Sequence, residues 1–226
     1  MEVSKRNLYI GCFASLILCI FYICILDYYT FPSGDEIGTA DSAINWVTNG
    51  EWYSAVWVYT YHPLHNFLLT LWISVFGVSH QAVCSMNVVI AFIVSLLCLK
   101  ILSERKITNS LFSVLLFVFL FWAIAPHSNG RIDCLMLLFS LGIADQLIPS
   151  SENRKKNNKL LAFYSFGLMF TGIYSLPILL VLGIALLIYA RKDVEKRNVL
   201  ITQAKIIVLF CFISFLVIFF NFFFCL

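Results

Sequence analysis

The chain has 226 residues, of which 61% are hydrophobic and 12% are charged, and its mean hydropathy is +0.91. One soluble core cannot bury this much apolar surface, and several apolar segments are long enough to cross a bilayer. The composition therefore predicts an all-α protein, a polytopic bundle of transmembrane helices forming a single membrane domain over residues 1–226. The formal net charge of +3 comes from short basic runs between apolar segments, and no signature of nucleic-acid binding accompanies it.

The first apolar segment follows Lys5 and Arg6 and has no small-residue cleavage site after it. This pattern indicates an uncleaved first span and a cytoplasmic N-terminus. About seven spans are expected, near residues 8–27, 81–102, 108–125, 131–149, 160–175, 176–190 and 204–224. They place three later basic loops, residues 100–106, 154–159 and 191–205, on the cytoplasmic side of a plasma or inner membrane.

The segment from Pro63 to Phe76 is apolar but too short to be a span. A helix over these residues reaches only about 21 Å, whereas a hydrocarbon core is about 30 Å thick. A crossing here would also move every later basic loop to the outside. We therefore expect an interfacial or re-entrant helix that begins at Pro63 and ends at Gly77.

A second short helix is expected over residues 35–48, in the first external loop, residues 28–80. Its apolar residues recur at helical spacing on one face, and polar residues cover the others, which is typical of a helix in the membrane surface. The apolar positions are Ile37, Ala40, Ile44 and Val47, and the polar positions are Asp41, Ser42, Asn45 and Thr48. Asn49 and Gly50 are expected to end this helix.

Two adjacent carboxylates, Asp35 and Glu36, lie soon after the first span in a stretch, residues 7–99, without lysine or arginine. With no basic residue nearby to neutralise it, the pair suits proton or cation chemistry. The order Ser33-Gly34-Asp35-Glu36 also has the form of a capping box, in which Glu36 reaches back to the amide of Ser33. The residues alone leave a catalytic and a purely structural role for Asp35 open.

The order of these features resembles the N-terminal half of the GT-C superfamily of polytopic glycosyltransferases. This superfamily includes protein O-mannosyltransferases and lipid A aminoarabinose transferases. The matching segments are Asp35-Glu36, Asn49-Gly50-Glu51-Trp52, Tyr61-His62-Pro63-Leu64, Phe76-Gly77 and Asn129-Gly130-Arg131-Ile132-Asp133. Family members are longer, and this chain stops inside an apolar run, so a truncated or partial enzyme is expected.

The resemblance implies transfer of a sugar from a polyprenyl-phosphate donor to a lipid, glycan or protein acceptor on the extracytoplasmic face. Such a transfer needs a base for the acceptor's proton and cations for the departing phosphate. Asp35 is the expected base. Arg131 is the expected phosphate ligand, because it is the only lysine or arginine on the predicted outer face. The alternative role of Arg131 is that of an interfacial snorkelling arginine.

Glu36, His62, His65 and Asp133 complete the expected substrate-binding residues. His62 and His65 are spaced i, i+3, so they could face one site and hydrogen-bond the phosphate. With Asp35 or Glu36 they could hold a divalent cation, although no metal-ligand spacing supports a metal site and no other cofactor is expected.

Asp133 and Asp145 are acidic residues near the ends of an expected span. Asp133 is close to Arg131 and could orient it. Asp145 is expected to be structural and to lie near water on the cytoplasmic side.

A non-catalytic membrane subunit or a transporter with an acidic external loop is the alternative function. A transporter should show paired broken helices or internal repeats, and the sequence has no convincing repeat.

Overall fold

The computed structural model describes residues 13, 16–21, 23–24, 34–51, 62–104, 132–147, 157–172, 175–193 and 196–224. Residues in these ranges form helices and their connections, and none of them forms a strand. The prediction of an all-α chain is confirmed to this extent. Of the expected spans, the one near residues 108–125 lies outside the described residues, and so does much of the one near residues 8–27.

Three described helices are long and apolar enough to cross a membrane. They are α4 (His80–Glu104), α8 (Ser175–Lys192) and α9 (Arg197–Phe224). Two further helices that were expected to be spans are shorter: α6 (Asp133–Leu147) has 15 residues and α7 (Asn158–Thr171) has 14. At 1.5 Å per residue each reaches only about 21 to 23 Å, so the structure supports three spans and leaves the expected seven as a prediction.

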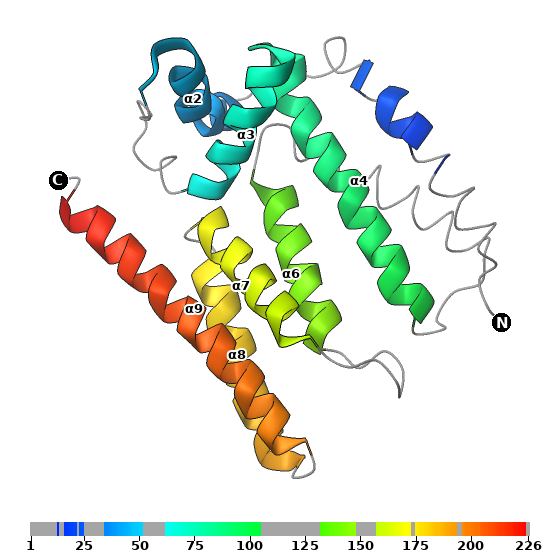
Figure 1. Ribbon diagram of the computed structural model, residues 1–226, viewed down its shortest axis with the longest axis vertical. Helices are drawn as coiled ribbons and strands as arrows, with labels where there is room; N and C mark the ends of the chain where they lie inside the picture. The colour runs from blue at the N-terminus through cyan, green and yellow to red at the C-terminus, as the bar shows by residue number, and fades with distance from the viewer. Residues whose placement is uncertain are drawn as a thin grey trace.

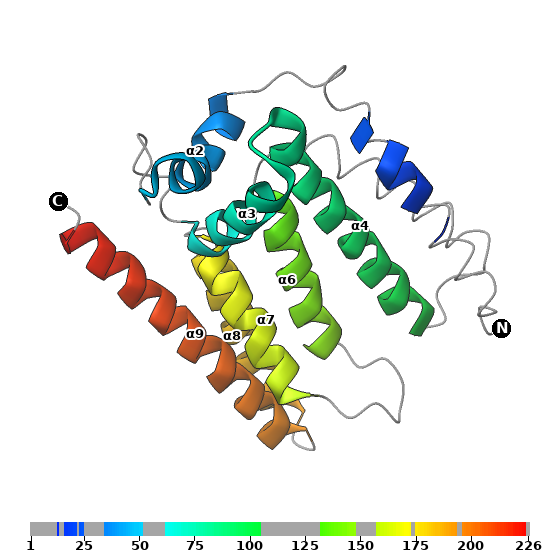
Figure 2. The ribbon, with the colours of Figure 1, turned by 45° about the horizontal axis from the view of Figure 1, so that its top comes forward.

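Two short helices cover one end of the longer ones (Figures 1 and 2). They are α2 (Gly34–Asn49) and α3 (Pro63–Phe76), and α3 packs against α2, α4 and α7. The expected local signals set their bounds. Proline is the first residue of α3, and the amide of Gly77 closes the helix on the carbonyl of Ile73 at 2.9 Å. Gly50 (φ 73°) follows the end of α2 in the left-handed region.

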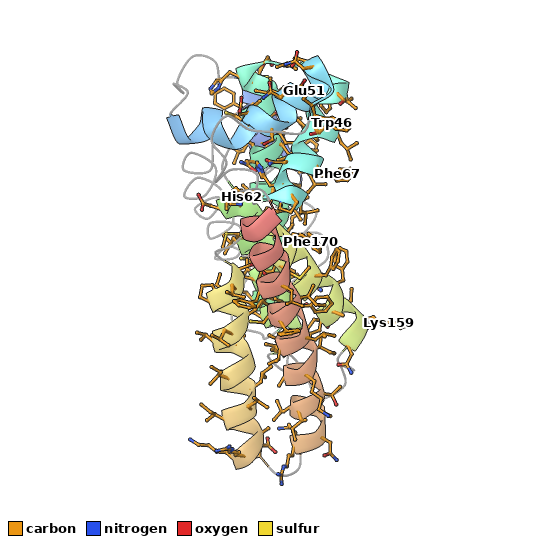
Figure 3. All side chains as sticks on the ribbon, turned by 90° about the vertical axis from the view of Figure 1, so that its left-hand side faces the viewer. Trp46, Glu51, His62, Phe67, Lys159 and Phe170 are labelled. Carbon is orange, nitrogen blue, oxygen red and sulfur yellow. The ribbon has the colours of Figure 1, made fainter. Side chains whose placement is uncertain are left out.

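Basic side chains gather at the opposite end of the molecule. The C-terminus of α4, the N-terminus of α7 and the connection between α8 and α9 all lie away from α2 and α3, and the connection lies farthest from them (Figure 1). The described lysines and arginines are in or near these segments: Lys100, Lys159, Arg191, Lys192, Lys196, Arg197 and Lys205. In Figure 3, Lys159 lies well away from Glu51 and His62. The described part of the chain thus has a basic end and an end capped by α2 and α3.

Glycines allow α6 and α7 to approach closely. A Cβ on Gly142 would collide with the ring of Tyr164, and one on Gly167 would collide with the ring of Phe139. Each helix therefore places an aromatic side chain against a glycine of the other, which fixes their register. Small residues have this effect at helix contacts in membranes, where close packing rather than water exclusion drives association.

Asp145 joins α6 to α4, and its side chain is buried instead of being in direct contact with water. Its side chain is 1% exposed, because it is in the last turn of α6 and faces α4. Its Oδ2 accepts a hydrogen bond from Lys100 Nζ at 3.4 Å and another from Gln146 Nε2 at 3.2 Å. Lys100 is 48% exposed, so its cation reaches water while it offsets the buried carboxylate.

Candidate functional site

His62 precedes the first turn of α3 and is buried. Its Nδ1 lies 3.1 Å from the backbone oxygen of Thr171, at the end of α7. A carbonyl oxygen can only accept a hydrogen bond, so Nδ1 carries the proton. In the neutral ring the lone pair is then on Nε2, which defines the tautomer at the start of α3.

Gly172, the residue after α7, makes this contact sterically feasible. A Cβ at Gly172 would collide with the His62 ring, and it would lie 3.6 Å from Cδ1 of Ile132. The start of α3, the end of α7 and the residue before α6 therefore meet at one point. His62 and Thr171 are 109 residues apart in the sequence.

Ile132 lies between two predicted site residues, Arg131 and Asp133. Asp133 is the first residue of α6 and is exposed. Arg131 lies outside the described residues, so the expectation that Asp133 orients it stays a prediction.

His65 lies in the first turn of α3 and is fully buried. Neither ring nitrogen has a hydrogen-bond partner among the described residues. Burial, and then the proximity of His62, lower the pKa of His65 to about 4. The Asn66 side chain partly offsets this lowering, although no hydrogen bond of ordinary geometry joins it to either His65 nitrogen. His65 is therefore neutral at pH 7, so it offers a phosphate no positive charge.

Asp35 and Glu36 belong to the first turns of α2, and the described residues do not include their side chains. Later on α2, Ser42 and Ala43 are fully buried. The burial of Ser42 corrects its expected place on an outer polar face.

The sequence did not point to Thr171 or Gly172. The only local signal was a Thr-Gly pair inside an expected span, and nothing in it indicated a contact with His62. The predicted boundary between the expected spans 160–175 and 176–190 is also slightly late. In the structure α7 ends at Thr171 and α8 begins at Ser175.

The described side chains include no group of three or more His, Cys, Asp and Glu residues that could hold a metal ion. A cation site that uses Asp35 or Glu36 falls partly outside these side chains, so that hypothesis is not tested. Comparisons with protein-family models, with curated proteins and with solved structures found no match to the chain. The GT-C resemblance thus rests on the sequence motifs alone.

Proposed function

We propose that the protein is a GT-C-type membrane glycosyltransferase that moves a sugar from a polyprenyl-phosphate donor to a lipid, glycan or protein acceptor. The meeting of His62, Gly172 and Ile132 supports this proposal most directly. It brings together described residues from two of the five segments that resemble the family, His62 from Tyr61-His62-Pro63-Leu64 and Ile132 from Asn129-Gly130-Arg131-Ile132-Asp133. Another of these segments, Asp35-Glu36, is on α2, which packs against α3.

The separation of charge supports an extracytoplasmic site. Basic segments of membrane proteins are retained on the cytoplasmic side, and Lys159, in one of the basic segments described here, lies well away from His62 (Figure 3). The proposal therefore has the capped end outside a plasma or inner membrane, which the three sufficiently long apolar helices would cross. A polyprenyl-phosphate donor presents its sugar at the membrane surface, where the capped end would then lie.

The proposed reaction assigns one task to each residue. The carboxylate of Asp35 takes the proton of the acceptor hydroxyl as the acceptor oxygen bonds to the anomeric carbon of the sugar. The bond from that carbon to the phosphate oxygen breaks, and the lipid phosphate leaves with the bonding electrons. Arg131 stabilises the charge that develops on it. His62 and His65 act as hydrogen-bonding groups, while Glu36 orients the substrate and Asp133 orients Arg131.

Substitutions of Arg131 test the assignment of the phosphate contact. Arg131→Lys keeps the charge but loses the bidentate contact, so the transfer rate should fall. In Arg131→Gln the charge is lost as well, and the transfer rate should fall further, by about 10²- to 10³-fold. The rate is measured in membranes at matched expression with a polyprenyl-phosphate sugar donor. Arg191→Gln, at an exposed position in the last turn of α8, is the matched control and should transfer normally. Equal rates for wild type and Arg131→Gln would remove Arg131 from the mechanism.

A further inference from the structure

The polarity of α3 is inverted relative to a helix on the surface of a soluble protein. Its exposed positions carry Phe67, Leu71, Val75 and Phe76, and Ser74 is the only polar residue among them. Its buried positions include three polar residues, His65, Asn66 and Thr70, beside Leu69 and Ile73. In water the opposite pattern is favoured, because apolar surface is buried and polar groups are hydrated.

Phe67, Leu71 and Val75 form a continuous stripe, because they recur every four residues along α3. We call these three residues the α3 stripe. It is about 12 Å long at 1.5 Å per residue, and each of its side chains is at least half exposed. No charged residue interrupts it, since residues 62–99 contain no Lys, Arg, Asp or Glu.

The exposed surface at the C-terminal end of the neighbouring helix α2 is mostly polar. Its exposed residues at the C-terminal end are Trp46, Thr48 and Asn49, followed by Gly50 and Glu51. Figure 3 shows Glu51, Trp46 and Phe67 following one another from the capped end inward. This order of a charged residue, a tryptophan and an apolar residue is the order found from water through the headgroup layer to hydrocarbon.

The helix α3 also leads directly into an apolar helix. Only residues 77–79 separate α3 from α4, whose first 23 residues form a candidate membrane span, and Val78 between the two helices is exposed. The chain therefore passes from α3 into a candidate span without a charged residue between them.

We infer that the α3 stripe is an interaction surface for the hydrocarbon chains of one bilayer leaflet, while the adjacent end of α2 is in water. The occupant is lipid because the stripe is apolar and uncharged and belongs to a helix that leads directly into a candidate span. The buried face of α3 then places His62 and His65 on the protein side of a helix whose other side contacts lipid. This inference holds or fails independently of sugar transfer, because it concerns only where α3 lies.

Nitroxide spin labels on the full chain in phosphatidylethanolamine and phosphatidylglycerol vesicles test this inference. Leu71→Cys and Phe67→Cys report on the stripe, and Thr48→Cys on α2 is the matched control, all in a background without the native cysteines. Labels at Leu71 and Phe67 should collide often with oxygen, which concentrates in hydrocarbon, and rarely with a water-soluble nickel chelate. The label at Thr48 should show the reverse order.

Frequent collision with the nickel chelate at both Leu71 and Phe67 would place the stripe in water and overturn the inference. Rare collision with both reagents would also overturn it, because the stripe would then be covered by a second copy or another protein. Labelled variants are compared only if their thermal stability matches that of the cysteine-free parent, and Val75→Cys replaces any stripe variant that fails this criterion.

Discussion

The ring of His62 lies so close to Gly172 that a methyl group on Gly172 would collide with it. Gly172→Ala should therefore displace the ring and break its hydrogen bond to Thr171, which lowers the free energy of unfolding by about 1 to 3 kcal/mol. The measurement is thermal or denaturant unfolding in detergent. The same substitution in a His62→Ala background should cost less, since the colliding ring is gone and only the strain of alanine at a φ of 159° remains. An equal cost in both backgrounds would show that the two residues are not in contact.

His65 makes stability depend on pH in a defined direction. Its pKa is about 4 in the folded chain and 6.5 in the unfolded one. Between these values only the unfolded chain binds the proton, so this residue's contribution to stability is complete above pH 6.5 and is lost as the pH falls toward 4. His65→Gln cannot titrate. The fall in melting temperature between pH 7 and pH 5 should be smaller in this variant than in wild type, and an identical fall would contradict the burial of a neutral histidine.

Residue types identified His62 and His65 as candidates, but not the partners that define their chemistry. A polar residue near the start of a helix is visible in the sequence, and so is the i, i+3 spacing. The contact of His62 with Thr171 depends on how α3 and α7 pack across 109 intervening residues. Local periodicity contains no information about that packing, so neither the tautomer of His62 nor the burial of His65 could be predicted.

At the scale of elements, local sequence signals predicted where helices begin and end better than they predicted which face of each helix is buried. Pro63 and Gly77 delimit α3 as expected, because proline suits a first turn and glycine can close a helix. The burial of Ser42 on α2 and of Asp145 on α6 was not foreseen. Both depend on which face meets a neighbouring helix, and a chain with 61% hydrophobic residues offers several equally apolar faces.

The ion pair between Lys100 and Asp145 links α4 and α6, and the loss of Lys100 should destabilise the protein more than the loss of the Asp145 charge. Lys100→Met leaves a buried carboxylate without this cation, whereas Asp145→Asn leaves a lysine that already reaches water. We expect Lys100→Met to lower the free energy of unfolding by about 1 to 3 kcal/mol, less than for a fully buried pair because Lys100 is half exposed. Asp145→Asn should cost less. The double variant should recover part of the loss in a detergent unfolding assay, and strictly additive losses would exclude the link.

At the scale of the whole molecule, composition predicted the all-helical architecture because 61% hydrophobic residues in long runs can be accommodated in few other ways. The placement of the basic segments at one end of the described chain is also as expected (Figure 1). Composition did not predict the number of spans equally well, since α6 and α7 were expected to be spans but are apolar and short. Hydropathy alone does not distinguish a short span from a helix packed inside a bundle.

We propose that the end capped by α2 and α3 catalyses sugar transfer, with Asp35 as the base. The most direct test compares Asp35→Asn with Glu36→Gln for transfer rate, donor-lipid binding and thermal stability. Asparagine keeps the shape of Asp35 but cannot take the proton, so transfer should fall by about 10²- to 10⁴-fold while donor binding survives. Glu36→Gln can still close a capping box, and its cost should appear mainly as stability. If Asp35→Asn transfers sugar at a near-normal rate, or if both variants lose only stability, the acidic pair is a helix cap and the catalytic assignment is wrong.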